Sequence, residues 1–371
     1  MIRRARIVTR EAEFLGSMRI ARRTIVAVDD GANSPGEDWG GDYLLPGLVE
    51  LHTDNLEKHL MPRPKVRWPE MPALLAHDSE IANSGITTVF DALGVGDVDE
   101  EALRGQDMGS VLAALDQASD VLRAEHFIHV RCELPAPNVL ELFAPFADHP
   151  RVGLISLMDH TPGQRQWMNI EQARIYYTGR KGWSDEKFER VVAEGVELQD
   201  RYALKHRRYF LDYARARGIP LASHDDTTAE HVAQACGEGM TISEFPTTMQ
   251  AAQAARELKL GIVAGAPNLV RGASHSGNVS ALELAREKLL DALSSDYVPV
   301  SLLHAAFLLE SRGGFSLPDA IATVSANPAR LAGLTDRGEI AVGLRPDFIR
   351  VRLINGVPVV LGTWRAGRPN I

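Results

Sequence analysis

The chain has 371 residues, of which 45% are hydrophobic and 24% are charged, and its formal net charge is −9. This balance is typical of a soluble globular protein and excludes a mostly disordered chain, while the negative charge argues against a nucleic-acid-binding protein. No apolar run approaches the roughly 18 residues needed to cross a bilayer, and the basic start lacks the apolar core of a signal peptide. Two cysteines, Cys132 and Cys236, exclude a disulfide framework, so we expect a reducing, cytoplasmic location.

Both ends of the chain are predicted to be rich in short β-strands. Residues 1–45 combine β-branched runs with a turn-rich stretch, DDGANSPGEDWGGD. Near the C-terminus, three strand-like runs are separated by Gly, Pro and Asn-Gly turns: EIAVG, PDFIRVRLI and VPVVLGTWRAG. Two similar ends around a different middle predict one small β-sandwich domain built from residues 1–45 and 335–371.

The middle of the chain, residues 46–334, alternates short apolar runs with turns and helical patterns. Eight runs are predicted to be strands: YLLPGLVEL, GITTVFDAL, FIHVRCE, VGLISLMD, IPLASHD, TISEF, LGIVAG and LLDALSSD. Eight strand–helix units over about 270 residues predict an α/β fold, a (β/α)8 TIM-like barrel. Residues 161–206 are too many for a simple connection and predict a helical insertion or lid.

Imidazoles and carboxylates follow the apolar runs, at the strand ends where barrel enzymes carry their chemistry. The residues are His52, Asp54, Glu133, His160, His224, Asp225, Asp226 and Asp296. They are donors suited to zinc or a similar divalent ion. His52 and Asp54 lie two residues apart at a strand end, so both point to the same side of the pleat and one ion can take both. Each residue alone also fits a structural histidine or a helix N-cap, but together they favour a metal site.

Two groups of basic side chains in this otherwise acidic protein predict an anionic, phosphorylated substrate. The residues are Lys58, His59, Arg63, Lys65 and Arg67 in the first group, and Arg271 and His275 in a Gly-rich stretch with accessible backbone N–H groups. A solvated loop and a plain barrel loop are the respective alternatives. The insertion adds Arg165, Arg174, Arg180 and Lys181, most of which we interpret as part of a solvated face.

Other polar residues of the predicted strands and helices are interpreted mainly as structural. Asp91 and Glu244 end the second and sixth strands, where they could orient ligand side chains. The remaining candidates are assigned to packing: His77, Asp78, His126 and His129.

The string PGLVELHTD, the strand-end donors and the closing SANPARLAGLTDRGEIAVGLRPDFIRV resemble the amidohydrolase superfamily over nearly the whole chain. This resemblance implies a metal-dependent hydrolase barrel beside a small β-sandwich formed by both termini. Most members carry His-x-His after the first strand, whereas this chain has His52-Thr53-Asp54. The longer strings PGLVELHTDNLEKHLMPRPKVRWP, RCEL, DHTPGQRQ, SHDDTT, SEFPTT and GAPNLVRGASHSGN resemble the PhnM family of phosphonate metabolism.

The resemblance to the PhnM family implies a metal-dependent diphosphatase of the carbon–phosphorus lyase pathway. Such an enzyme hydrolyses α-D-ribose 1-methylphosphonate 5-triphosphate to the 5-phosphate and pyrophosphate. The resemblance assigns one or two divalent ions, expected to be Zn²⁺, to His52, Asp54, Glu133, His160, His224 and Asp296, and Glu133 could bridge two ions. Asp296 is then expected to act as the general base. The expected phosphate-binding residues are Lys58, His59, Arg63, Arg67, Arg271 and His275.

Three other functions stay open. One is a C–N hydrolase such as an N-acetyl sugar phosphate deacetylase, which would release acetate instead of pyrophosphate. The second is a nucleotide hydrolase of broad specificity, and the third is a non-catalytic scaffold, against which the six retained donors argue. We expect a small phosphorylated substrate, no nucleic-acid or membrane partner, and, by analogy with the superfamily, a homodimer.

Overall fold

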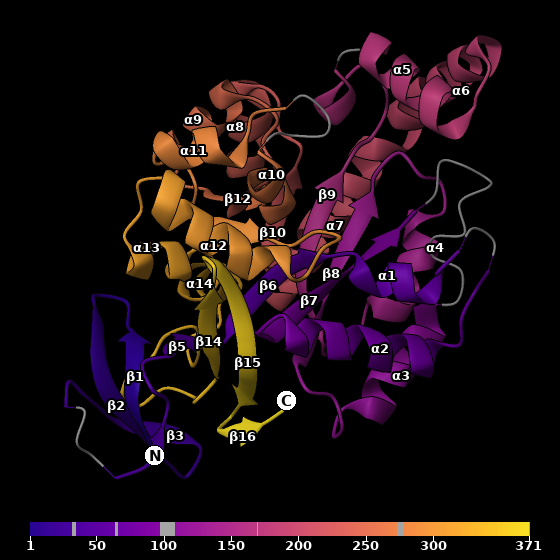
Figure 1. Cartoon of the computed structure of the whole chain (residues 1–371). Helices are drawn as coiled ribbons and strands as arrows, with labels where there is room; N and C mark the ends of the chain where they lie inside the picture. Colours follow the sequence, from indigo (N-terminus) through magenta and orange to yellow (C-terminus); the bar gives the residue numbers. More distant parts are fainter. Residues whose placement is uncertain (32–34, 64–65, 97–107, 169, 273–277, 371) are drawn as a thin grey trace. The chain divides into compact units, whose positions relative to one another are not determined.

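The computed structural model describes residues 1–31, 35–63, 66–96, 108–168, 170–272 and 278–370 (Figure 1). The chain divides into two compact units, which are treated separately below. Unit 1 contains Met1–Asp91, Ala113–Phe127 and Val263–Ile371, and unit 2 contains Ala92–Leu112 and Ile128–Ile262. Among the described residues, no helix combines the length and the apolar character that crossing a bilayer requires.

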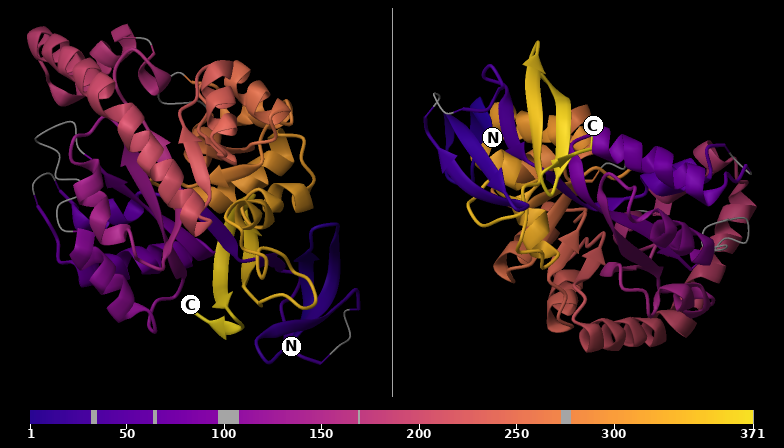
Figure 2. Two further views of the ribbon diagram at one scale, coloured as in Figure 1. Left: turned by 180° about the vertical axis from the view of Figure 1, so that it is seen from behind. Right: turned by 90° about the horizontal axis from the view of Figure 1, so that it is seen from below.

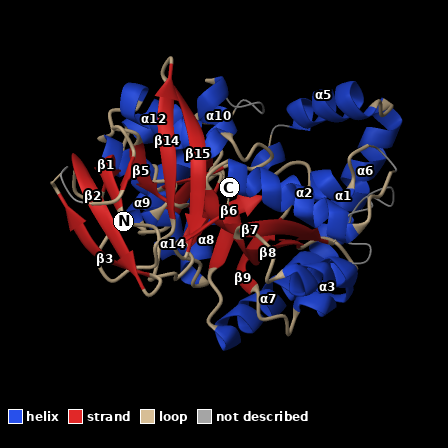
Figure 3. Cartoon of the chain, turned by 60° about the horizontal axis from the view of Figure 1, so that its bottom comes forward, coloured by secondary structure: helices blue, strands red, loops and turns tan. Residues whose placement is uncertain are grey.

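Strands from both termini form one mixed sheet, here called sheet A, which lies in unit 1. Its order is β16-β15-β14-β5-β1-β2-β3, with β4 paired to β1. The bounds are β1 Ile2–Val8, β2 Glu13–Ala21, β3 Thr24–Asp29, β4 Glu37–Asp38, β5 Tyr43–Pro46, β14 Phe348–Ile354, β15 Val357–Arg365 and β16 Arg368–Pro369. The C-terminal strands β14 and β15, yellow in Figure 1 and red in Figure 3, join the N-terminal strands through the β5–β14 pair. The prediction that the two termini build one β-structure is confirmed.

Local turn chemistry and an apolar cluster explain sheet A. Asn355 and Gly356 connect β14 to β15 with positive φ angles of 53° and 80°, as a two-residue Asn-Gly hairpin requires. The rings of Phe348 and Trp364 stack with centroids 4.8 Å apart, and Trp39 packs on Trp364 at 5.4 Å. These aromatic side chains bring together segments from opposite ends of the sequence.

The prediction of a strand at EIAVG, residues 339–343, is wrong. The segment touches β3 through only two backbone hydrogen bonds, in which Gly343 N–H donates to Ile25 O at 2.9 Å and Ile25 N–H donates to Leu344 O at 3.0 Å. Gly343 has φ 94°, so the backbone turns away before a ladder can form. Ile340 is buried in the apolar cluster of sheet A, and this packing explains the strand-like hydrophobicity.

The eight predicted strands of the middle region all form, and they make up sheet B. Its order is β13-β12-β11-β10-β9-β8-β7-β6, and the pairs β6–β7, β8–β9, β9–β10, β10–β11 and β12–β13 are parallel. The bounds are β6 Leu48–Thr53, β7 Ile86–Val95, β8 Glu125–Glu133, β9 Val152–Met158, β10 Leu221–His224, β11 Ile242–Glu244, β12 Gly261–Gly265 and β13 Ala292–Ser294. A parallel bridge between Thr53 and Asp296 joins the first strand to the residues after the last. The predicted (β/α)8 barrel is confirmed.

Helices follow the barrel strands. Unit 1 contains α1 Asn55–Leu60, α2 Glu70–Asn83, α10 Ala266–Arg271, α11 Ala281–Arg286, α12 Ser301–Arg312, α13 Leu317–Ala322 and α14 Ala326–Leu331, and α3 Met108–Ala118 has residues in both units. Unit 2 contains α4 Val139–Phe143, α5 Ile170–Lys181, α6 Asp185–Leu198, α7 Leu204–Arg217, α8 Ala229–Gly237 and α9 Met249–Glu257. A π-helical turn at Gln199–Ala203 joins α6 to α7 in one continuous rod (Figure 2, left).

Candidate active site

The six predicted metal ligands divide equally between the two units. His52, Asp54 and Asp296 belong to unit 1, and Glu133, His160 and His224 belong to unit 2. All six lie within two residues of the C-terminal ends of sheet B strands, where catalytic residues of barrel enzymes lie.

In unit 2, the end of β8 is linked to the residues after β9 by a carboxylate and an imidazole. His160 Nδ1 lies 2.5 Å from Glu133 Oε2, and the backbone N–H of His160 donates to Glu133 Oε1 at 2.9 Å. Both oxygens of Glu133 therefore hold His160. The ring nitrogen that does not face Glu133, Nε2, is left to point toward other groups of the site.

Asp225 completes this group, together with His224 at the end of β10. Asp225 Oδ2 lies 2.9 Å from His224 Nδ1 and 3.7 Å from His160 Nε2. Donor atoms of His160, His224 and Asp225 all lie within 4.8 Å of one another. Two imidazole nitrogens and a carboxylate oxygen at this spacing fit the donor set of a divalent ion such as zinc.

The protonation states within this group are set by mutual charge. Burial would raise the pKa of Glu133, but the neighbouring His160 outweighs it and holds the pKa below its usual value. Burial would lower the pKa of His160, but Glu133 outweighs it and raises the pKa. Burial would also raise the pKa of Asp225, and here His224 is the main opposing group, so that the pKa is lowered. Both carboxylates are therefore ionised at neutral pH, as metal ligands must be.

Arg165 does not lie on the solvated face that the sequence favours for most basic residues of the insertion. Only 7% of its side chain is exposed, and Nη1 lies 2.9 Å from Asp226 Oδ1. The same nitrogen donates to the backbone oxygen of His224 at 2.8 Å. Asp226 is also the acceptor for the hydroxyl groups of Ser223 and Ser243. This buried ion pair attaches the start of the insertion to the end of β10, next to His224.

In unit 1, backbone hydrogen bonds bring together the three remaining predicted ligands. Asp296 N–H donates to His52 O at 3.2 Å, and Asp54 N–H donates to Asp296 O, also at 3.2 Å. Thr53 Oγ1 donates to the same Asp296 oxygen at 2.6 Å. Asp296 has φ 53°, a left-handed conformation that aspartate tolerates better than most residues. The β6 and β13 ends are thus joined through main-chain atoms.

Glu50, a residue that the sequence reasoning did not single out, lies beneath this junction. Its carboxylate accepts the backbone N–H of His52 at 2.7 Å and that of Ser295 at 2.6 Å. Complete burial raises the pKa of Glu50 to about 7, even though these hydrogen bonds favour the ionised form. A glutamate inside an apolar strand was the only sequence signal for it.

The first two basic residues, Lys58 and His59, lie on α1 and share one carboxylate. Lys58 Nζ is 3.5 Å from Glu80 Oε1, and His59 Nε2 is 2.9 Å from Glu80 Oε2. Lys58 Nζ also donates to Asn55 Oδ1 at 3.1 Å. More than half of the Lys58 side chain, 57%, is exposed, so its ammonium group is open to an anion as well as to Glu80.

The other predicted phosphate-binding residues have more varied surroundings. Arg67 pairs with Glu70 at the start of α2, with Nη2 3.0 Å from Oε1, whereas Arg63 is exposed in the preceding loop. Arg271 is exposed at the last position of α10. Lys65 and His275 lie outside the described residues.

Asp225 and Arg165 are the residues of unit 2 whose environments the sequence reasoning did not anticipate. Strand alternation would turn Asp225 away from His224, but Asp225 has φ 55°, and this turn brings its carboxylate back beside the imidazole. The signal was present as two aspartates directly after a strand-end histidine. No local signal marks Arg165, because its partner Asp226 is 61 residues later in the sequence.

Comparison with known proteins gives one relative over the full length. The chain is 42% identical over 374 aligned positions to the α-D-ribose 1-methylphosphonate 5-triphosphate diphosphatase of Escherichia coli (strain K12), covering 99% of both proteins. No protein-family model matches the chain.

Solved structures share the fold at low sequence identity. The 5-methylcytosine deaminase of Klebsiella pneumoniae superposes with a TM-score of 0.66 at 15% identity, covering 100% of this chain and 97% of that one. The N-acetylglucosamine-6-phosphate deacetylase of Pasteurella multocida superposes with a TM-score of 0.62 at 14% identity, covering 99% and 98%. The resemblance to the PhnM family inferred from sequence motifs is thereby confirmed: with 42% identity over nearly its whole length, the chain belongs to the PhnM family of diphosphatases.

Proposed function

We propose that the chain is a metal-dependent diphosphatase that hydrolyses α-D-ribose 1-methylphosphonate 5-triphosphate to the 5-phosphate and pyrophosphate during phosphonate catabolism. The observation that carries this proposal is the 42% identity, over 99% of both chains, to a protein with that activity. The cluster of ionised carboxylates and imidazoles at the strand ends supports it. Cytoplasmic location and a homodimer stay predictions.

The proposed cofactor is one or two divalent ions, with Zn²⁺ as the proposed metal. The proposed ligands are Asp225 and the six predicted residues, which are His52, Asp54, Glu133, His160, His224 and Asp296. Glu133 stays in this set because a carboxylate offers about four lone-pair directions, of which His160 occupies two. A bound ion of this kind lowers the pKa of water and neutralises charge on phosphoryl oxygens.

The proposed reaction is attack of water on the α-phosphorus, with cleavage of the bond to the bridging oxygen and departure of pyrophosphate. We assign to Asp296 the removal of the proton from the attacking water. Its carboxylate follows the last barrel strand, and its backbone is fixed on both sides by His52 and Asp54. A general base of this kind accelerates a reaction by about 10²–10⁴-fold.

The basic residues are proposed to bind the phosphate and phosphonate groups. Lys58 is the strongest candidate, because its exposed ammonium group lies four residues after Asp54 and is anchored by Asn55. The remaining proposed residues are His59, Arg63, Arg67, Arg271 and His275. Charge-assisted contacts from such side chains are suited to a triphosphate.

Phosphorus NMR on the purified, zinc-supplemented protein tests the proposal. Incubation with α-D-ribose 1-methylphosphonate 5-triphosphate should produce pyrophosphate and the 5-phosphate, whereas ATP in a parallel sample should produce little pyrophosphate. Equal turnover of both compounds would indicate a nucleotide hydrolase of broad specificity. If neither compound is cleaved while metal is bound, the diphosphatase proposal is wrong, and release of acetate from N-acetyl sugar phosphates becomes the next assay.

A further inference from the structure

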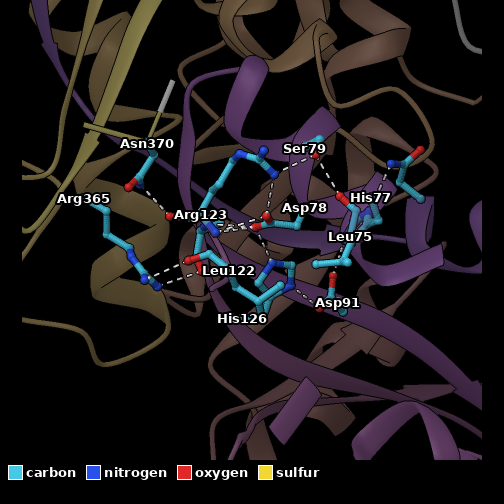
Figure 4. Close-up of polar contacts among 12 residues, drawn as sticks. Leu75, His77, Asp78, Ser79, Asp91, Leu122, Arg123, His126, Arg365 and Asn370 are labelled. Carbon is cyan, nitrogen blue, oxygen red and sulfur yellow. Dashed lines mark hydrogen bonds and ion pairs between the residues drawn. The ribbon is translucent and has the colours of Figure 1, made fainter. Parts of the chain in front are cut away.

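A chain of hydrogen bonds runs through the interior of unit 1, outside the group of predicted ligands (Figure 4). At its centre, Asp91 Oδ2 lies 2.8 Å from His126 Nδ1, and Asp91 Oδ1 lies 2.7 Å from His77 Nε2. These three side chains are completely buried. On the far side of His126, Asp78 Oδ1 lies 3.3 Å from Nε2. These hydrogen bonds connect β7, α2 and the start of β8.

The charges in this hydrogen-bond network determine which atoms carry protons. Burial would lower the pKa of His126, but Asp91 and Asp78 outweigh it and raise the pKa to about 9, so both ring nitrogens donate. Burial would raise the pKa of Asp91, but the two histidines hold it low. Burial lowers the pKa of His77 despite Asp91, so His77 is neutral at pH 7. Its single N–H is therefore Nε2–H, given to Asp91, and its Nδ1 can only accept.

That constraint passes to Asn55, the first residue of α1. Its Nδ2 lies 3.1 Å from His77 Nδ1 and 3.1 Å from Glu80 Oε2. Both amide hydrogens therefore have acceptors. The amide oxygen faces the other way and accepts from Lys58 Nζ at 3.1 Å. Rotating the amide would set its oxygen against the lone pair of His77 and against Glu80 Oε2, so His77 and Glu80 together determine the orientation of Asn55.

We propose that Asp91 is a positioning residue for substrate binding: through His77 it fixes the amide of Asn55, and through Asn55 it holds Lys58 ready for a phosphate group. This inference rests on the proposed function, because it takes Lys58 as a ligand of the triphosphate. A network with a purely structural role would only need a hydrogen-bond partner for each of its buried polar atoms. This network also leads from the buried carboxylate of Asp91 to the ammonium group of Lys58, whose side chain is 57% exposed.

A double-mutant cycle between Asp91→Asn and Lys58→Met tests the proposal on the zinc-loaded protein. Each single variant should raise the KM for α-D-ribose 1-methylphosphonate 5-triphosphate by about tenfold while kcat changes little, as loss of one contact to a charged group predicts. The double variant should match Lys58→Met, because Asp91 then has nothing left to position. Additive effects on KM, or an unchanged KM in Asp91→Asn, would overturn the proposal.

Asp78→Asn is the matched control. Asp78 is equally buried and contacts the same His126, but its other contacts are the backbone N–H groups of Arg123 and Ala124 and the Arg123 guanidinium, with Nη1 3.4 Å from Oδ2. We expect a loss of stability with a KM near that of the wild type. A KM increase equal to that of Asp91→Asn would overturn the directional role.

If Asp91→Asn does not fold, two substitutions of His77 give the same test. The amide of His77→Asn can reach the place of Nδ1 and accept from Asn55, whereas the amide of His77→Gln extends toward Asp91. We expect a smaller KM increase in His77→Asn, and the reverse order would overturn the proposal. Nitrogen NMR of the histidine rings adds a readout without substrate: the wild type should show the neutral Nε2–H form of His77. Absence of that form overturns this inference, whereas a wild type that releases no pyrophosphate overturns the proposed function.

Discussion

Glu133 and His160 are joined twice, once through the imidazole at 2.5 Å and once through the backbone N–H at 2.9 Å. This double contact fixes both the ring and the main chain of a residue that follows a strand, in a segment that leads into the insertion. It explains how a loop residue can be held as firmly as a strand residue. Preorganisation of this kind is needed for a ligand that must meet an ion with little freedom.

Replacing Glu133 by Gln should therefore reduce metal binding and activity together. The amide can satisfy the backbone N–H of His160, but its NH₂ group would face the ring N–H and favour rotation or a change of tautomer. We expect at least about a tenfold loss of metal affinity, in the range seen for residues that orient ligands. Metal analysis after dialysis and pyrophosphate release measure the two effects. Glu141→Gln, an exposed position of α4, is the control, and normal metal content in Glu133→Gln would contradict the assignment.

Asp296→Asn should separate catalysis from metal binding. Asparagine tolerates the positive φ of position 296, and the contacts that join this residue to His52 and Asp54 are made by backbone atoms. The fold and the bound metal should therefore change little, while kcat falls by about 10²–10⁴-fold through loss of the base. Full activity in this variant would remove Asp296 from that role. A large loss of metal would instead indicate that it acts mainly as a ligand.

Arg165→Gln should destabilise the protein, because Asp226 would remain buried without its cation. Breaking a buried ion pair costs about 3–5 kcal/mol, and this pair also contacts the backbone of His224. Urea unfolding measures the effect. Arg190→Gln is the control, since Arg190 lies on α6 in a solvent-exposed pair with Glu194, 3.8 Å apart, and should lose about 0–1 kcal/mol. Equal losses in the two variants would show that the buried pair does not stabilise unit 2.

The sequence supports prediction of the fold and of the strand-end donors for the same physical reason. Short apolar runs and their polar ends are local features, so the eight strands and residues such as His52 and His224 can be read in place. The environment of Arg165 could not be predicted in this way, because its burial depends on the Asp226 carboxylate, which only folding brings near. Asp225 was among the strand-end donors but not among the six expected ligands, and its place beside His224 depends on a positive φ that reverses strand alternation. His77 and Asp91 were recognised as buried or orienting residues, but their link through Asn55 to Lys58 depends on α1 packing against α2.

The stability of unit 1 should fall as the pH rises from about 6.5 to about 9. His126 has a pKa of about 9 in the folded protein, because Asp91 and Asp78 outweigh the effect of burial, while an unfolded histidine titrates near 6.5. A group whose pKa is raised by folding stabilises fully below its unfolded pKa, and this stabilisation is lost as the pH passes through the folded value. The difference corresponds to about 3 kcal/mol. Urea unfolding at pH 6 and pH 9.5 should show the loss in the wild type and a much smaller one in His126→Gln, which is less stable at pH 6 but has no proton to release. An equal decrease in the free energy of unfolding between pH 6 and pH 9.5 in both proteins would mean that His126 is neutral in the folded state.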